Sequence, residues 1–252
     1  DLHWMVHSFP TRRSSDLAII ATPIGNLGDI TMRALETLRN SHVIAAEDTR
    51  HSLQLLNSLN IKKPLISCRS FNEEKESDRI IRKVLDGENV SYICDAGTPC
   101  ISDPGSKLIS KALANGIEPV FVPGVSALTF AVSACSLPVA KFAFYGFPPV
   151  KSGRRRKFLE KIKDEDKTVF LYESPHRISK LLSEISETIG ADADVAVIRE
   201  ATKIHEECLR GKISEIIYNT KDKNWKGEIV VAIYPPSAKN QEKDDEDEKD
   251  RL

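Results

Sequence analysis

Short apolar runs that alternate with amphipathic segments constrain the fold of this chain more than any other feature of its sequence. From residue 18 onward, runs such as AIIAT, HVIAA and VSYIC have the length and composition of buried strands. The segments that follow them carry the apolar spacing of helices. Repeated alternation of this kind is typical of a mainly parallel sheet covered by helices. The sequence therefore predicts an α/β fold.

A proline-rich joint near residues 138–150 interrupts the alternation, which then resumes. Beyond the joint we expect strands at FAFYG, TVFLY, VAVIR and EIVVAIY, and helices at SGRRRKFLEKI and PHRISKLLSEISETI. Two α/β domains of ordinary size follow, each with a mainly parallel or mixed sheet. We expect the first domain to span residues 18–138 and the second to span residues 139–236.

Both ends of the chain differ in character from these two domains. The segment HSFPTRRSSDL, residues 7–17, reads like a translated sequencing adapter and fits no element of the fold, so we treat residues 1–17 as non-native. Residues 237–252 are rich in acidic side chains, which is typical of a disordered, solvated tail.

Composition excludes several classes of function. The 36 Lys and Arg against 37 Asp and Glu leave a nearly neutral chain, which argues against strong indiscriminate binding to nucleic acid. The five cysteines contain no C-x-x-C pair, and His176 and His205 lack metal-ligand spacing, so no metal is expected. No apolar run is long enough to span a membrane. We expect a cytoplasmic protein with reduced thiols.

Three loops rich in glycine and proline follow predicted strands. TPIGNLGD follows the first strand, DAGTPCISDPG the fourth and PGVSA the fifth. Because the carboxyl ends of parallel strands meet at one edge of a sheet, these loops predict a ligand cleft rather than a set of ordinary turns. At the end of the second loop, Asp103 is expected to cap the next helix, with Pro104 as its first residue.

The loops favour a ligand without phosphate groups. Neither G-x-G-x-x-G nor G-K-[ST] is present, so a nucleotide-phosphate site is poorly supported. Glu47 lies where a dinucleotide-binding fold often places its ribose-binding acid, and a nicotinamide-dependent oxidoreductase therefore stays as an alternative. A cofactor held by backbone groups and apolar walls, such as S-adenosylmethionine, fits the loops better.

Six motifs occur in a specific order along the chain: ATPIGNLGDIT, AAEDTR, DAGTPCISDPG, PGVSAL, YESPHR and REATKIHEE. Together they resemble the ribosomal RNA small-subunit methyltransferase I family of the tetrapyrrole-methylase superfamily, over about residues 18–234. The resemblance implies two α/β domains with S-adenosylmethionine in the cleft between them, usually as a homodimer. It also implies 2′-O-methylation of a cytidine in the decoding region of 16S rRNA, within the small ribosomal subunit. A methylase of a tetrapyrrole or another small molecule is the alternative in the same superfamily.

The resemblance and the loop positions assign cofactor binding to Pro23, Ile24, Gly25, Asp95, Gly97, Thr98, Pro99, Ser126 and Ala127. For Asp95, a role as an Asx-turn acceptor that shapes its own loop is an equal alternative. A ribose hydroxyl needs a base to remove its proton. The candidate bases or orienting groups are Glu47, Asp48, Glu200, Lys203 and Glu206. The alternative is that these charged side chains form structural salt bridges.

The run KSGRRRK opens the first helix of the second domain. Its cations are Lys151, Arg154, Arg155, Arg156 and Lys157, which would bind RNA phosphates or form a solvated helix face.

The chain departs from the family pattern in two places. Where the family usually carries YHxHNE this chain has CRSFNE, Cys68–Glu73, so only Asn72 and Glu73 persist. The role of those histidines therefore does not carry over. Many members also continue into a small helical domain where this chain has its acidic tail.

Overall fold

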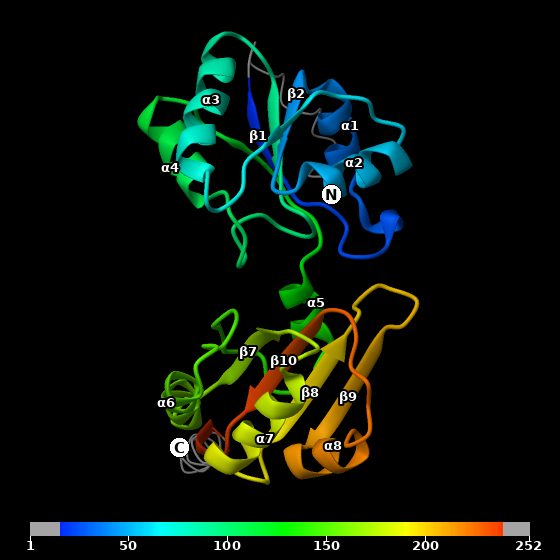
Figure 1. Ribbon diagram of the computed structural model, residues 1–252, viewed down its shortest axis with the longest axis vertical. Helices are drawn as coiled ribbons and strands as arrows, with labels where there is room; N and C mark the ends of the chain where they lie inside the picture. The colour runs from blue at the N-terminus through cyan, green and yellow to red at the C-terminus, as the bar shows by residue number, and fades with distance from the viewer. Residues whose placement is uncertain (1–15, 239–252) are drawn as a thin grey trace, which may run out of the picture. The chain divides into compact units, whose positions relative to one another are not determined.

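The computed structural model describes residues 16–238, so the predictions for residues 1–15 and for the tail from residue 239 lie outside the described part of the chain. The chain divides into two compact units, one ending at Ser126 and the other beginning at Ala127 (Figure 1). The boundary lies before the expected joint at residue 138, because helix α5 (Ala127–Ala134) packs on the sheet of the second unit. Each unit holds one five-stranded sheet.

The sheet of the first unit is entirely parallel, as the alternation predicts. Its strands lie in the order β3-β2-β4-β1-β5, and each neighbouring pair runs parallel. Their bounds are β1 Leu17–Ile20, β2 Val43–Ala46, β3 Leu65–Ser67, β4 Val90–Ile93 and β5 Val120–Val122. With this order, the loops after β4, β1 and β5 leave neighbouring strands at the same edge of the sheet.

Helices cover both faces of the first sheet (Figure 1). Helices α1 (Met32–Asn40) and α2 (Thr49–Ser58) pack on one face, and α3 (Glu73–Leu85) and α4 (Ser106–Ala114) pack on the other. Successive side chains of a strand point to opposite faces. Ile19 of β1 accordingly belongs to the core under α3 and α4, while Ile20 belongs to the core under α1 and α2.

Asp16 and Leu17 take part in this sheet although they were assigned to the non-native segment. The Leu17 side chain is fully buried, and Leu17 pairs with Val90 of β4. The Asp16 carbonyl accepts a hydrogen bond from the Val90 amide at 2.8 Å, and the Asp16 amide donates to Asn89 Oδ1 at 3.1 Å. Asp16 and Leu17 therefore belong to the first unit.

The second unit has the mixed sheet that the sequence allowed. Its order is β6-β7-β10-β8-β9; β6 and β7 run parallel, whereas the other neighbours run antiparallel. The bounds are β6 Phe142–Phe144, β7 Thr168–Glu173, β8 Asp194–Arg199, β9 Glu207–Lys212 and β10 Ile229–Tyr234. The edge strand β9 was not predicted, because its sequence ECLRGK has too few apolar residues to read as a strand.

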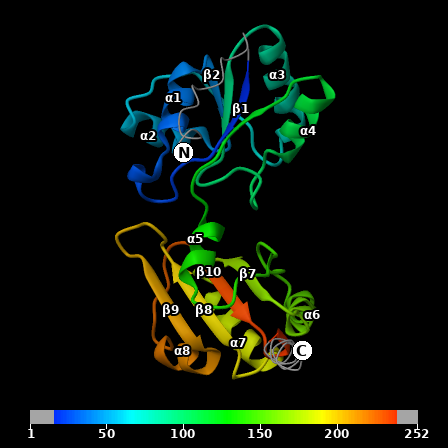
Figure 2. The same cartoon turned by 180° about the vertical axis from the view of Figure 1, so that it is seen from behind.

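Helices α6 (Ser152–Lys163), α7 (Ile178–Thr188) and α8 (Ile213–Asn219) cover one face of this sheet, and α5 covers the other (Figure 2). Beyond the expected end at residue 236, the Ala238 side chain is buried and the Ser237 hydroxyl donates to the Glu165 carbonyl at 2.8 Å. These two residues pack on the second unit instead of starting the tail. No helix within residues 16–238 has the length and apolar character that crossing a membrane requires.

Candidate active site

The three glycine and proline loops of the first unit contact one another at the carboxyl edge of its sheet, as predicted. The backbones of Thr22 and Gly97 exchange two hydrogen bonds, with N···O distances of 2.9 and 3.0 Å. The Thr98 hydroxyl donates to the Val125 carbonyl at 3.0 Å. The loop after β4 is thus joined to the loop after β1 on one side and to the loop after β5 on the other.

Gly97 lies where these loops meet. Its φ of +82° is in the left-handed region, and a Cβ at this position would lie 3.1 Å from Ile24 Cγ2. Glycine is therefore needed both for the backbone conformation and for the close approach of the loops. In the same loops Pro23, Ile24 and Pro99 are buried, whereas Gly25 is exposed.

Thr22 is a residue of this region that the sequence analysis did not select. Its side chain is 1% exposed, and its Oγ1 atom has no hydrogen-bond partner within the described residues. A buried hydroxyl without a partner is unfavourable, so it is a group that a bound ligand would satisfy. The signal available in the sequence was its place directly after the apolar run of β1.

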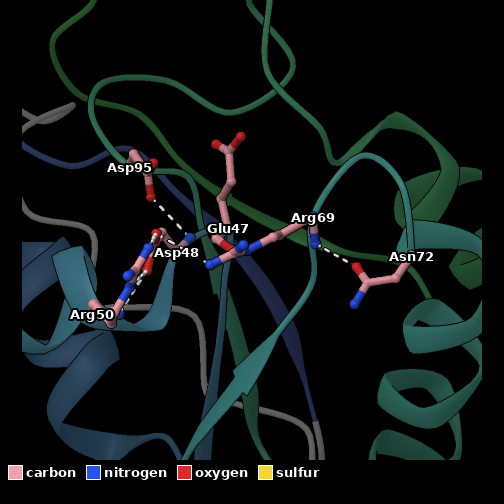
Figure 3. A network of polar contacts seen from close by, with 6 residues as sticks. All are labelled: Glu47, Asp48, Arg50, Arg69, Asn72 and Asp95. Carbon is pink, nitrogen blue, oxygen red and sulfur yellow. Dashed lines mark hydrogen bonds and ion pairs between the residues drawn. The ribbon is translucent and has the colours of Figure 1, made fainter.

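Asp95 connects the ends of two strands. Its Oδ1 atom accepts a hydrogen bond from the Asp48 amide at 2.9 Å (Figure 3). The two roles considered from sequence were a cofactor contact and an Asx turn within its own loop. The structure adds a third role, because this carboxylate ties the loop after β4 to the end of β2.

Asp48 is held by arginines. Its carboxylate accepts from the Arg50 amide at 2.9 Å and from Arg50 Nη2 at 2.8 Å, and Arg69 Nη2 lies 3.1 Å from Oδ2 (Figure 3). The hydrogen bonds from Arg50 hold the pKa of Asp48 well below its usual range. A carboxylate engaged in this way is a weak proton acceptor, and Asp48 instead caps helix α2.

Glu47 has the opposite electrostatic environment. Burial raises its pKa, and the charges of Asp95 and Asp103 raise it further. Figure 3 shows its carboxylate pointing away from the guanidinium groups of Arg50 and Arg69. Of the two acids in AAEDTR, Glu47 is therefore the better proton acceptor near neutral pH.

The candidates in REATKIHEE brace a loop of the second unit. Lys203 Nζ lies 2.9 Å from Glu200 Oε1 and 2.9 Å from Glu228 Oε2, and Glu206 accepts from the Thr202 amide at 2.7 Å. Burial raises the pKa of Glu200, but the hydrogen bonds from Lys203 and from the Glu228 amide outweigh it and leave this pKa lowered. These contacts correspond to the salt-bridge alternative.

The basic run on α6 contains side chains of two kinds. Arg155 is buried; its Nη2 donates to Glu184 at 2.8 Å and its Nη1 donates to the Val150 carbonyl at 2.9 Å. Arg155 is therefore a structural residue and is not available to RNA, which corrects its assignment. The other cations of the run are exposed: Lys151, Arg154, Arg156 and Lys157.

Helix α4 begins later than predicted. Gly105 is its N-cap residue, so the assignment of Asp103 and Pro104 to this helix start was wrong. The carboxylate of Glu73, a buried residue of α3, accepts from the Gly105 amide at 2.9 Å and from the Lys107 amide at 3.0 Å. An acid from a different helix thus supplies the cap, which short-range sequence rules do not foresee.

The CRSFNE segment connects β3 to α3 and contacts Glu47 and Asp48, the two acids that follow β2. Arg69 Nε donates to the Glu47 carbonyl at 3.2 Å, and Asn72 Oδ1 accepts from the Arg69 amide at 2.7 Å (Figure 3). The two residues that persist from the family pattern, Asn72 and Glu73, therefore shape the loop and cap α4.

Comparison with known proteins identifies the family. Residues 16–217 match the family model for tetrapyrrole (corrin/porphyrin) methylases. A protein of Thermotoga maritima named ribosomal RNA small subunit methyltransferase I is 46% identical over 217 residues, covering 86% of this chain and 97% of that protein. The chain belongs to the ribosomal RNA small subunit methyltransferase I family. A Pseudomonas aeruginosa member of this family is 42% identical over 219 residues, covering 86% of this chain and 78% of that protein.

Solved structures agree with the fold of this methyltransferase I family member. Uroporphyrin-III-C-methyltransferase from Thermus thermophilus gives a TM-score of 0.60 at 19% identity, covering 87% of this chain and 94% of that chain. A cobalt precorrin-4 methyltransferase gives a TM-score of 0.64 at 18% identity, covering 89% of this chain and 98% of that chain. At such identities the likeness concerns the fold, and it confirms the predicted tetrapyrrole-methylase-like α/β architecture.

Proposed function

We propose that this protein transfers a methyl group from S-adenosylmethionine to the ribose 2′-oxygen of a cytidine in the decoding region of 16S rRNA. The observation that carries the proposal is the placement of Glu47 beside Asp95, at the edge where the three loops meet. The names of the relatives support rRNA of the small subunit as substrate. We further propose that the enzyme acts in the cytoplasm on the small ribosomal subunit, as the homodimer that the family resemblance implies.

The residues at the loops fit a cofactor that lacks phosphate groups. The buried hydroxyl of Thr22 has no partner within the described residues, and exposed Gly25 leaves its backbone accessible. Buried Ile24 and Pro99 supply apolar surface. S-adenosylmethionine, when bound, supplies an electrophilic methyl group. Its proposed contacts are Thr22 and the residues selected from sequence: Pro23, Ile24, Gly25, Asp95, Gly97, Thr98, Pro99, Ser126 and Ala127.

Glu47 is the proposed general base. A ribose hydroxyl is a poor nucleophile until its proton is removed, and the raised pKa of Glu47 brings its carboxylate closer to the range of an effective base. Asp95 holds the ends of β2 and β4 together through the Asp48 amide. The geometry around Glu47 is therefore fixed before the substrate binds, which is the condition for efficient positioning.

The exposed cations of α6 are the proposed RNA contacts of the second unit. Lys151, Arg154, Arg156 and Lys157 would bind phosphates, and their contribution would decrease as salt concentration rises. Arg155 is excluded from this set because Glu184 and two backbone carbonyls occupy its guanidinium group.

Methyl transfer to small ribosomal subunits tests the proposal. Subunits from cells that lack the gene are incubated with the protein and with S-adenosylmethionine labelled on its methyl group, and the rRNA is digested to nucleosides. We expect the label in 2′-O-methylcytidine. Label on a base carbon or nitrogen, or transfer to a tetrapyrrole but not to rRNA, would contradict the proposal and favour the small-molecule alternative.

A further inference from the structure

The loop between β3 and α3 presents an aromatic ring to solvent. Phe71 is 82% exposed, so its ring contributes little to the core. The loop follows the carboxyl end of β3, which is the neighbour of β2 in a parallel sheet. Phe71 therefore lies on the same edge of the sheet as Glu47.

The exposure of Phe71 does not come from a loosely held loop. The Arg69 amide donates to Asn72 Oδ1 at 2.7 Å, and the Asn72 amide donates to the Arg69 carbonyl at 3.0 Å. The next residue, Glu73, is buried and bound to the first turn of α4. Phe71 thus lies between two anchored positions, and the backbone holds its ring outward.

Two arginines connect this loop to the candidate active site. Arg69 donates to the Glu47 carbonyl and pairs with Asp48, and Arg50 pairs with the same carboxylate. The side chains of Arg50 and Arg69 are 82% and 36% exposed. Because one carboxylate serves two guanidinium groups, Arg50, Arg69 and Asp48 together carry a net charge of +1, beside the carboxylates of Glu47 and Asp95. The nearby acid Glu74 shares Lys111 with Asp78, at 2.8 and 2.7 Å.

We infer that Phe71 stacks on a nucleobase of the RNA substrate while Arg50 and Arg69 hold an adjacent phosphate; the inference rests on the proposed function. Stacking on an aromatic ring tolerates any base, and guanidinium groups match the geometry of phosphate oxygens. The exposed ring belongs to the loop that carries Arg69, and Arg50 lies at the same carboxyl edge of the sheet. An aromatic ring and guanidinium groups on one surface supply the two kinds of contact that single-stranded RNA uses. This surface, formed by Arg50, Arg69 and Phe71, positions the strand that carries the target ribose.

Kinetics of Phe71 variants test the inference. With small ribosomal subunits as substrate, Phe71→Ala should raise KM about tenfold, since loss of one stacked base typically costs that much. Its kcat should change less than about twofold, and its affinity for S-adenosylmethionine should not change, because the ring contacts only the RNA. Phe71→Tyr should retain wild-type KM. The matched control is Phe121→Ala, which removes a ring that is 53% exposed. Phe121 lies on β5, the outer strand on the far side of the sheet from β3.

A binding measurement separates this inference from the proposed function. In Phe71→Trp, single-stranded oligocytidylate should quench the added indole fluorescence, measured against the wild-type protein, whereas Phe121→Trp should not respond. Arg50→Ala should reduce the slope of log affinity against log salt by about one. If oligocytidylate quenches Phe71→Trp but the wild-type protein transfers no methyl group to small ribosomal subunits, the RNA-binding surface is upheld and the proposed function is refuted. An unchanged KM in Phe71→Ala would overturn the inference. A raised KM in Phe71→Ala without quenching in Phe71→Trp would also overturn it, because Phe71 would then contact a ribosomal protein and not RNA.

Discussion

Glu47 is half-buried beside two other carboxylates, and this environment predicts opposite effects of its removal on activity and stability. Glu47→Gln should lower kcat by roughly 10²–10⁴-fold, the usual contribution of a general base. The amide carries no charge to desolvate, so the variant should melt at or above the wild-type temperature at neutral pH. Rate measurements beside thermal melts check both effects. The control is Glu74→Gln, which alters an exposed carboxylate of α3 and should leave the rate unchanged.

The raised pKa of Glu47 also predicts the pH dependence of the reaction. A protonated carboxylate accepts no proton, so kcat should fall as pH decreases through the Glu47 pKa, which lies above the usual glutamate range. The effect of Glu47 ionisation on folding stability has the opposite pH dependence: stability increases where kcat decreases. Because folding raises this pKa, ionised Glu47 destabilises the fold at pH values above it. This penalty decreases as pH falls below the folded-state pKa, and it is absent below the usual glutamate range. A pH profile of kcat that stays flat down to the usual glutamate range would exclude Glu47 as the base.

Thr22 offers a test of the cofactor site in which affinity should fall while stability is not lost. Thr22→Val keeps the shape of the side chain but removes a buried hydroxyl without a partner in the described residues. The free protein should not lose stability, since no hydrogen bond is broken. Affinity for S-adenosylmethionine should fall about tenfold, the value of one hydrogen bond to a ligand.

Calorimetric titration and a thermal melt of Thr22→Val separate these effects, and Thr22→Ser should restore affinity. Wild-type affinity in the valine variant would remove Thr22 from the cofactor site. A lowered melting temperature would show instead that the hydroxyl supports the fold.

At the level of secondary-structure elements, the link between α3 and α4 depends on Glu73. Glu73→Ala removes the acceptor of two backbone amides at the start of α4 and should lower the free energy of unfolding by about 1–3 kcal/mol. The same change loosens the end of the loop that contains Gly97, so affinity for S-adenosylmethionine should also fall. Glu73→Gln keeps one acceptor oxygen and should recover most of both losses. Denaturant melts with calorimetry provide the measurement.

Helix α6 predicts different outcomes for neighbouring arginines. Arg155→Ala breaks a buried ion pair with Glu184 and should cost about 3 kcal/mol of stability. Arg154→Ala removes an exposed cation and should change stability by less than about 0.5 kcal/mol while weakening RNA binding at low salt. Melts and RNA titrations of the two variants check this. If both variants lost RNA affinity equally and had equal stability, the distinction between a structural Arg155 and an RNA-binding Arg154 would be refuted.

Helical spacing could have indicated the buried position of Arg155. Arg155, Leu159 and Ile162 share the buried face of α6, and this spacing is visible in the sequence. The partner Glu184 lies on another helix, so no local pattern could supply it. The cap of α4 by Glu73 could not be predicted from a local pattern either, because Glu73 lies on helix α3. The alternation of apolar runs was sufficient to predict the parallel sheet. It was not sufficient to predict the edge strand β9, because the polar sequence of this strand carries little periodicity.

For the whole molecule, the order of the motifs carried more information than any one of them. Each motif taken alone fits an ordinary turn or helix start, whereas their sequence along residues 18–234 indicated the family that the relatives then showed. The convergence of three loops at one edge follows from the parallel order of the first sheet. The partners of individual side chains, such as the arginines around Asp48, depend on tertiary contacts that the order of motifs does not contain.

The most direct test of the central claim is mass mapping of small-subunit rRNA from cells with and without the gene. Loss of the gene should remove one 2′-O-methyl group from a cytidine in the decoding region. The wild-type gene should restore this methyl group, and the Glu47→Gln gene should not. Unchanged methylation of 16S rRNA after loss of the gene would contradict the claim.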